Sequence, residues 1–327
     1  MKVCVIGDFS ENLDEGLKNL AHYITDYIPI SADFQLLKAN VKNIISVTTF
    51  REIKKFHPDI IHYVPGPTDK SFLLLKIIKI YLKYNFKVVL SAPHPMFSDA
   101  TLKLLNFKPD YVFASHKNLK ERVESLDIPS HLLPNGVDVE KFMPISDFEK
   151  RKLREKYDIQ KDRFTILHVG HLIANRNLEI FTKLSKENQV IIVASKYIGA
   201  NRKLLNNLRD AGCIIFQGYF PNIEEFYQLS DCYLFPVKKG DSILCPLSVM
   251  EAMSCNLPVA TTEFEGLKTF FEEGNGLIFA KKEDELIDGI ESIKKGNISI
   301  ATREKVEQYA WQGITKEIMQ VYKDLMD

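Results

Sequence analysis

The sequence lacks an excess of charge of either sign, because 43 lysine and arginine residues balance 43 aspartate and glutamate residues. Such a balance argues against a nucleic-acid binder that depends on a global basic field. No stretch of about 18 uninterrupted apolar residues is present, so we expect no membrane-spanning helix. The first ten residues, MKVCVIGDFS, include an aspartate at position 8 and do not resemble a signal peptide. We therefore expect a cytoplasmic protein without a nucleic-acid partner.

Several catalytic and metal-binding patterns are also missing. The five cysteines are an odd number and form no C-x-x-C, and no group of histidines and cysteines has the spacing of a zinc site. The chain has no G-x-x-x-x-G-K-[ST] loop, which excludes a P-loop nucleotide hydrolase. It also has no G-x-G-x-x-G after the first strand, which argues against a dinucleotide site. We expect reduced thiols, no metal and no cofactor.

What the sequence does contain is a series of short apolar runs that alternate with stretches of helix length. The 327 residues are enough for two domains, since domains cluster at about 100–200 residues. Most of the runs are continuously apolar, as in parallel strands that are buried on both faces. The fold class we predict is α/β, with two Rossmann-like doubly wound parallel-sheet domains that face each other across a cleft. The predicted strands are 3–7, 34–37, 44–47, 60–64, 87–91, 111–115, 164–170, 190–194, 213–217, 232–236, 258–260 and 277–279.

A join between the two predicted sheets lies in residues 133–162. It opens with the turn sequence PNGVD and continues with the charged sequence FEKRKLREKYD. We assign residues 1–143 to an N-terminal domain and 144–310 to a C-terminal domain. Two helical stretches, at about 300–309 and 312–326, end the chain.

In parallel sheets, ligands bind beyond the carboxyl ends of the strands, so the residues that follow each strand are the site candidates. In FTILHVGHLIANRNLEIF a strand leads to Gly170, His171 and Arg176. A glycine at this point lets a ligand approach the backbone, and the guanidinium fork of an arginine suits a phosphate. These residues predict a phosphate-binding loop.

A second candidate segment is GDSILCPLSVMEAMSCNLPVATTEFEG. Its proline, Pro246, opens a predicted helix whose first-turn amides, at Leu247 and Ser248, have no acceptor within the helix and can bind phosphate. One turn further on, the carboxylate of Glu251 could hold a ribose diol. Together with Arg176, this segment predicts a nucleoside-diphosphate pocket.

Two other glycines are weaker candidates. Gly16, near the start of the first helix, could belong to a loop that cradles an anion, although an ordinary strand–helix connection explains it equally well. The loop at Gly218 and Tyr219 could recognise a base through its backbone.

Three segments, PNGVDVEKF, VGHLIANRNLEIF and PLSVMEAMSCNLPVATT, resemble the linker, phosphate loop and nucleotide-binding helix of glycosyltransferase family 4, whose members have the GT-B fold. The resemblance covers most of the second half of the chain. It implies that a sugar is transferred from a nucleoside-diphosphate sugar with retention of its anomeric configuration. It also implies that Arg176 replaces a diphosphate-binding lysine, that Glu251 holds the ribose, and that the helix at about 311–327 packs back on the first domain.

The sequence also departs from the family pattern. His171 stands where the family has an arginine, and Ile243 stands where it has the first glutamate of a pair. Asp241 is the nearest carboxylate and could substitute for that glutamate. In the first domain, the resemblance suggests that His94 acts near the donor phosphate or the acceptor; alternatively, it belongs to a rigid Pro-His-Pro turn.

The chain contains no D-x-D sequence to carry a magnesium ion, so we expect a metal-independent reaction. Arg176, His171 and the helix amides would then offset the charge on the leaving diphosphate. His94 completes the set of catalytic candidates. The acceptor could be a glycan, a lipid carrier or a small metabolite.

Residues 70–87 (KSFLLLKIIKIYLKYNFK) carry five lysines and no acidic residue. A basic helix of this kind either docks on an anionic membrane, at the inner face of the cell membrane, or covers the sheet with one apolar face. Residues 1–143 hold 18 basic and 16 acidic residues, a balance that does not favour strong attraction to a membrane.

Two alternatives to the transferase stay open at this point. One is an epimerase or phosphorylase of the same fold that acts on a sugar nucleotide or sugar phosphate. The other is a catalytically weakened subunit that binds a nucleotide sugar or a partner enzyme, as Ile243 in place of the family glutamate allows.

Overall fold

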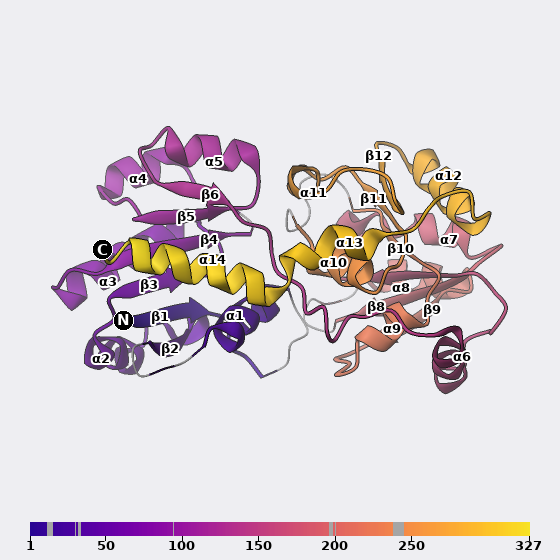
Figure 1. Ribbon diagram of the computed structural model, residues 1–327, viewed down its shortest axis with the longest axis horizontal. Helices are drawn as coiled ribbons and strands as arrows, with labels where there is room; N and C mark the ends of the chain where they lie inside the picture. The colour runs from indigo at the N-terminus through magenta and orange to yellow at the C-terminus, as the bar shows by residue number, and fades with distance from the viewer. Residues whose placement is uncertain are drawn as a thin grey trace. The chain divides into compact units, whose positions relative to one another are not determined.

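The computed structural model describes residues 1–11, 16–29, 31, 34–93, 95–195, 199, 201–237 and 245–327. These residues form two compact units, one of Met1–Asn135 with Trp311–Asp327 and the other of Gly136–Ala310. Each unit contains a six-stranded parallel sheet with helices on both faces (Figure 1). This is the predicted fold class.

The first sheet has the strand order β2-β1-β3-β4-β5-β6. Residues along a strand alternate between its faces, so Ile61 and Tyr63 of β3 pack in the core beneath α2–α5, while His62 faces the opposite side. The elements are β1 (Lys2–Gly7), α1 (Gly16–Tyr27), β2 (Gln35–Asn40), α2 (Val47–Phe56), β3 (Ile60–Tyr63), α3 (Asp69–Leu82), β4 (Lys87–Ala92), α4 (Asp99–Leu105), β5 (Tyr111–Ala114), α5 (Lys117–Glu124), β6 (Ser130–Leu132) and α14 (Trp311–Asp324).

Helix α14 lies with α1 on one face of this sheet, and Figure 1 shows it crossing the near side. The hydroxyl of Tyr322 on α14 lies 2.6 Å from Nδ1 of the buried His62, whose Nε2 lies 2.9 Å from Oγ of Ser91. Burial lowers the pKa of His62 to about 3, so its ring is neutral and acts as a structural link. The C-terminal helix therefore belongs to the first unit.

The two units divide at Asn135, whereas the sequence placed the division at residue 143. The difference arises because Val137 and Phe142 are buried in the hydrophobic core of the second unit. The amide of Val137 also donates to the carbonyl of Tyr309 at 3.0 Å, next to the point where the chain leaves that unit.

The second sheet has the order β12-β11-β10-β7-β8-β9. The chain passes from β7 outward to β9 and then returns to the other side of β7 with β10, so the topological switch point lies between β7 and β10. In open parallel sheets this is where ligands bind. The elements are α6 (Asp147–Lys156), β7 (Thr165–Val169), α7 (Ile180–Leu184), β8 (Gln189–Ala194), α8 (Arg202–Asp210), β9 (Ile214–Gln217), α9 (Glu224–Gln228), β10 (Cys232–Phe235), α10 (Leu247–Ser254), β11 (Val259–Thr262), α11 (Glu265–Phe270), β12 (Leu277–Ala280), α12 (Glu283–Lys294) and α13 (Thr302–Val306).

One predicted strand is wrong and one observed strand was missed. Residues 44–47 are the turn into α2, because the side chain of Ser46 accepts a hydrogen bond from the amide of Thr49 and caps that helix. The short edge strand β6 (Ser130–Leu132) contains no fully buried residue, so it has no continuous apolar run to reveal it.

None of the helices in the described ranges is both long enough and apolar enough to cross a membrane.

Candidate active site

The loop after β7 begins at Gly170, whose amide donates to the carbonyl of Val193 on β8 at 3.0 Å. A Cβ atom at this position would lie only 2.9 Å from Nε2 of His168. Glycine is therefore required for steric reasons, because the imidazole of the preceding strand fills the space that a side chain would occupy.

His168 is buried in the strand and is not a charged group. Its Nδ1 lies 3.0 Å from the carbonyl oxygen of Leu234 on β10, so Nδ1 carries the proton. Burial, together with the positive charges of Arg176 and His171, lowers the pKa of His168 to about 4. His168 therefore supports the glycine loop from within the core.

The rest of the loop is held by its backbone and by two buried leucines. The amide of Ile173 donates to the carbonyl of His171 at 3.0 Å, and the amide of Arg176 donates to the carbonyl of Ile173 at 3.1 Å. Leu172 and Leu178 anchor the loop in the core. His171, just before the first anchor, and Arg176, between the two, are half-buried, and both act on His168. The two predicted phosphate-binding side chains therefore lie close together.

Helix α10 begins after Pro246, which makes no side-chain cap. The amides of Val249 and Met250 both donate to the carbonyl of Pro246, at 3.2 and 3.3 Å. Those of Leu247 and Ser248 precede the first intrahelical bond, so they are the amides that such a helix can offer to an anion.

Tyr233, in the middle of β10, connects this helix to the β7 loop. Its hydroxyl donates to the carbonyl of Val169 at 3.2 Å and also hydrogen-bonds the side chain of Ser248. The positive charge of Arg176 acts on the same hydroxyl. Tyr233 was not among the predicted site residues, because its hydroxyl reaches this loop only through tertiary contacts.

Glu251 follows one turn into α10 and is 8% exposed. The hydroxyl of Tyr227 on α9 donates to its Oε2 at 2.7 Å. Burial raises the pKa of Glu251 to about 7, while the Tyr227 hydrogen bond and the charge of Lys141 act in the opposite direction. The Glu251 carboxyl group therefore changes between its protonated and ionised forms near neutral pH.

Lys141 links Glu251 to the loop that follows β9. Its Nζ donates to the carbonyl of Pro221 at 3.1 Å and lies 3.5 Å from Oε2 of Glu224. In the same loop, Gly218 has a φ of +148°, which favours glycine, and Tyr219 is 43% exposed.

The remaining predicted site residues lie elsewhere or are not described. Gly16 is the first residue of α1 and belongs to the first unit. His94 and Asp241 lie outside the described residues, as does Ile243. In the described part of the chain, no three His, Cys, Asp or Glu side chains gather as metal ligands.

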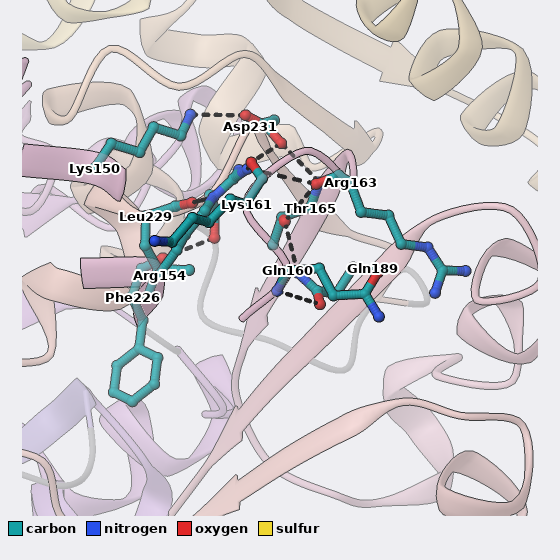
Figure 2. Close-up of polar contacts among 11 residues, drawn as sticks. Lys150, Arg154, Gln160, Lys161, Arg163, Thr165, Gln189, Phe226, Leu229 and Asp231 are labelled. Carbon is teal, nitrogen blue, oxygen red and sulfur yellow. Dashed lines mark hydrogen bonds and ion pairs between the residues drawn. The ribbon is translucent and has the colours of Figure 1, made fainter. Parts of the chain in front are cut away.

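The opposite, amino end of the second sheet carries a different polar cluster, which Figure 2 shows. Asp231 accepts hydrogen bonds from the amide of Thr165, from Arg154 and from Lys150, each at 2.7 Å. Arg154, only 5% exposed, also donates to the carbonyls of Leu229 and Lys161 at 2.9 and 2.6 Å. This cluster pairs two cations with one carboxylate and joins α6 to the strands.

The fold and the positions of these residues can be compared with known proteins. Residues 149–312 match the family model described as glycosyl transferases group 1. Sucrose-phosphate synthase from Thermosynechococcus elongatus has the same fold, with a TM-score of 0.76, 14% identity and 99% of each chain covered. The Anabaena protein HepE, solved with UDP and glucose, gives a TM-score of 0.73 at 15% identity, with 99% of this chain and all of HepE covered.

Two curated relatives extend the comparison. An uncharacterized glycosyltransferase of Methanocaldococcus jannaschii is 25% identical over 250 residues, or 68% of this chain and 62% of the relative. Alpha-monoglucosyldiacylglycerol synthase of Acholeplasma laidlawii is 23% identical over 216 residues, or 60% of this chain and 53% of the relative. The matched regions thus span between half and two thirds of these relatives. The chain belongs to the glycosyl transferases group 1 family and has the GT-B fold.

Proposed function

We propose that the protein transfers a sugar from a nucleoside-diphosphate sugar to an acceptor, with retention of the anomeric configuration and without a metal ion. The observation that carries this proposal is the convergence at the switch point of the second sheet. There Gly170, His171 and Arg176 follow β7, and Tyr233 connects their loop to the start of α10. Other GT-B reactions, such as epimerisation or phosphorolysis, would use the same pocket.

In the transfer step, the bond between the anomeric carbon and the diphosphate oxygen breaks, and negative charge develops on the leaving diphosphate. Arg176 would bind this group through its guanidinium fork, and a protonated His171 would add a second donor. The amides of Leu247 and Ser248 would stabilise the same charge without needing to reorient. These groups together could supply the role that a metal ion has in other transferases.

Glu251 would hold the ribose of the donor by accepting hydrogen bonds from its hydroxyl groups. The ionised carboxylate is the better acceptor, and the Tyr227 hydroxyl, 2.7 Å from Oε2, favours that form. The loop at Gly218 would contact the base through its backbone. Asp241 and His94 stay candidates for the sugar and the acceptor.

The relatives bear on the donor and the acceptor. HepE is a protein solved with UDP-glucose. Two relatives are named as synthases of glycosylated diacylglycerols, one from Acholeplasma laidlawii and one from Streptococcus pneumoniae. We propose a lipid-linked or glycan acceptor for this chain, and a location at the inner face of the cell membrane.

The test is thermal unfolding of the protein with UDP, GDP and ADP and their sugars, in the presence of a metal chelator. A ligand at 100 times its dissociation constant stabilises the folded state by about 2.7 kcal/mol. We expect one nucleotide to raise the melting temperature, and we expect Arg176→Ala to abolish the effect. The matched control is Arg202→Ala, at the exposed first residue of α8.

Turnover distinguishes the remaining alternatives. Removal of one donor to a developing negative charge costs about 3–4 kcal/mol, so Arg176→Ala should slow transfer at least a hundredfold. A chain that binds nucleotide but transfers no sugar to any acceptor would support the weakened subunit instead. No stabilisation by any nucleotide would contradict the proposal.

A further inference from the structure

Helix α3 has two apolar faces, whereas a helix that covers a sheet needs only one. Its inner face buries Phe72, Leu75, Ile78 and Leu82 in the core of the first unit. A second stripe, consisting of Leu73, Ile77 and Ile80, is 49%, 46% and 62% exposed. Residues spaced by four and three positions share one helix face, so these three side chains form a continuous outward stripe.

Lysines flank the outward stripe. Lys70, Lys79 and Lys83 are exposed, and Lys76 is half-buried with its Nζ 3.3 Å from the carbonyl of Asn106 at the end of α4. Asp69, at the first position of α3, is the helix's single acidic residue. Across the described chain, none of these four lysines is paired with a carboxylate.

The neighbouring helices continue this surface. The ring of Tyr81 on α3 packs against Phe50 on α2, with ring centroids 5.1 Å apart, and Nζ of Lys54 lies 5.3 Å from the centre of the same ring. On the other side lies α4, where Leu104 is 87% exposed. We call the exposed side chains of α3, together with Lys54 and Leu104, the basic apolar face.

The charge of the first unit is concentrated near this face. Residues 41–87 contain nine basic and three acidic residues, whereas the rest of 1–143 contains nine basic and thirteen acidic residues. The net charge of residues 1–143 is therefore close to zero because a positively charged segment of about fifty residues is offset by the negative net charge of the other residues. Only a local positive field matters for surface binding, since charges beyond about 10 Å are screened by salt.

We propose that the basic apolar face binds the surface of an anionic lipid bilayer. Leu73, Ile77 and Ile80 enter the boundary between headgroups and acyl chains, and the lysines extend along the helix so that their ammonium groups meet lipid phosphates. A nucleic acid would make no use of three exposed aliphatic side chains. The inference does not depend on the proposed transfer reaction, because the face and the nucleotide site lie in different units.

The experiment uses the full chain and sedimentation with vesicles of phosphatidylcholine, with and without phosphatidylglycerol. We expect binding only to the anionic vesicles, and weaker binding at high salt. Each lysine near such a surface is worth about fivefold in affinity, so Lys79→Gln with Lys83→Gln should cost about 25-fold. The matched control is Lys316→Gln with Lys323→Gln, two exposed lysines on α14, which lies on the other face of the same sheet.

A second variant tests the aliphatic stripe. Replacing Leu73, Ile77 and Ile80 by serine should abolish the binding that persists at high salt, while the melting temperature stays close to that of the wild type because the three side chains are exposed.

Equal binding by the Lys79/Lys83 variant and its α14 control would overturn the proposal. So would a wild-type protein that binds nucleotide but ignores both kinds of vesicle. If that protein dimerises and the serine variant does not, the face belongs to a second copy of the chain.

Discussion

The two ends of the second sheet are both rich in polar and charged side chains, but they are built differently. At the amino end, Arg154 and Lys150 both pair with the carboxylate of Asp231, so one carboxylate holds two cations. At the carboxyl end, Arg176 and His171 both act with positive charge on the same buried ring of His168. Opposite charges pair at the amino end, whereas groups suited to binding an anion follow the strands at the carboxyl end.

This difference shows how a binding end can be distinguished from a structural end. A network whose donors and acceptors match one another stabilises the fold and has nothing left for a ligand. The carboxyl end presents a guanidinium group, an imidazole and the first-turn amides of α10, which are groups that can bind an anion. We therefore assign stability to the amino end and propose that the donor binds at the carboxyl end.

The largest expected effect separates these two roles. Arg154→Ala removes one of the two cations that pair with Asp231 and also removes the donors to several carbonyls. Loss of one partner from a buried ion pair costs about 3–5 kcal/mol, so urea should unfold the variant at a much lower concentration. Arg151→Ala, at an exposed position of the same helix, should change stability by at most about 0.5 kcal/mol. Nucleotide affinity of the folded Arg154 variant should be unchanged; a loss would contradict the separation.

A smaller effect is expected at Gly170. The new Cβ of Gly170→Ala would lie 2.9 Å from Nε2 of His168, and overpacking of this kind costs about 1–3 kcal/mol. We also expect weaker nucleotide binding, because the loop must shift. In the double variant with His168→Ala the clash is gone, so the two changes should cost less together than the sum of their separate effects. Additive losses in denaturant unfolding would show that the ring does not set the requirement for glycine.

A third effect is a pH dependence at Glu251. Its folded-state pKa of about 7 lies above the usual value of 4.5, so the folded protein binds a proton more tightly than the unfolded chain does. Stability therefore falls as pH rises from about 4.5 to 7, and Glu251→Gln should remove this part of the slope. Nucleotide affinity should rise with pH over the same region in the wild type, as the carboxylate ionises.

Glu251→Gln should weaken nucleotide binding about tenfold at pH 8, where the wild-type carboxylate is ionised. Tyr227→Phe should move the pH midpoint of binding upward, because the hydroxyl that favours the charged form is lost. Isothermal titration calorimetry between pH 6 and 9 measures both the loss of nucleotide affinity in Glu251→Gln and the shift of the pH midpoint in Tyr227→Phe. An affinity that does not vary with pH in the wild type would remove Glu251 from the site.

The part of the fold that could be predicted from the sequence is the set of buried parallel strands, because these are continuously apolar. Strands such as β8 (Gln189–Ala194), with every residue buried, were found for this reason. Local rules failed where side-chain capping or an edge position decided the structure, at Ser46 and at β6. The division between the units was displaced because Val137 and Phe142 pack into a core that lies far along the chain.

The candidate site was predictable where a single segment carries the signal. Gly170, Arg176 and the start of α10 were candidates because each lies in the segment after a strand of the switch point or opens a helix. Tyr233 and Tyr227 could not, since their hydroxyl groups reach the site only through tertiary contacts. The amino-end cluster was invisible for the same reason: Arg154 and Asp231 are 77 residues apart.

The most direct measurement of the central claim is hydrogen exchange, followed by mass spectrometry, with and without a saturating nucleoside diphosphate. We predict that the backbone amides of residues 169–177 and 246–251 exchange more slowly when the nucleotide is bound. The exchange rates of residues 150–165 and 229–232 should not change. Protection at the amino end of the second sheet, or in the first unit alone, would contradict the assignment of donor binding to the carboxyl end.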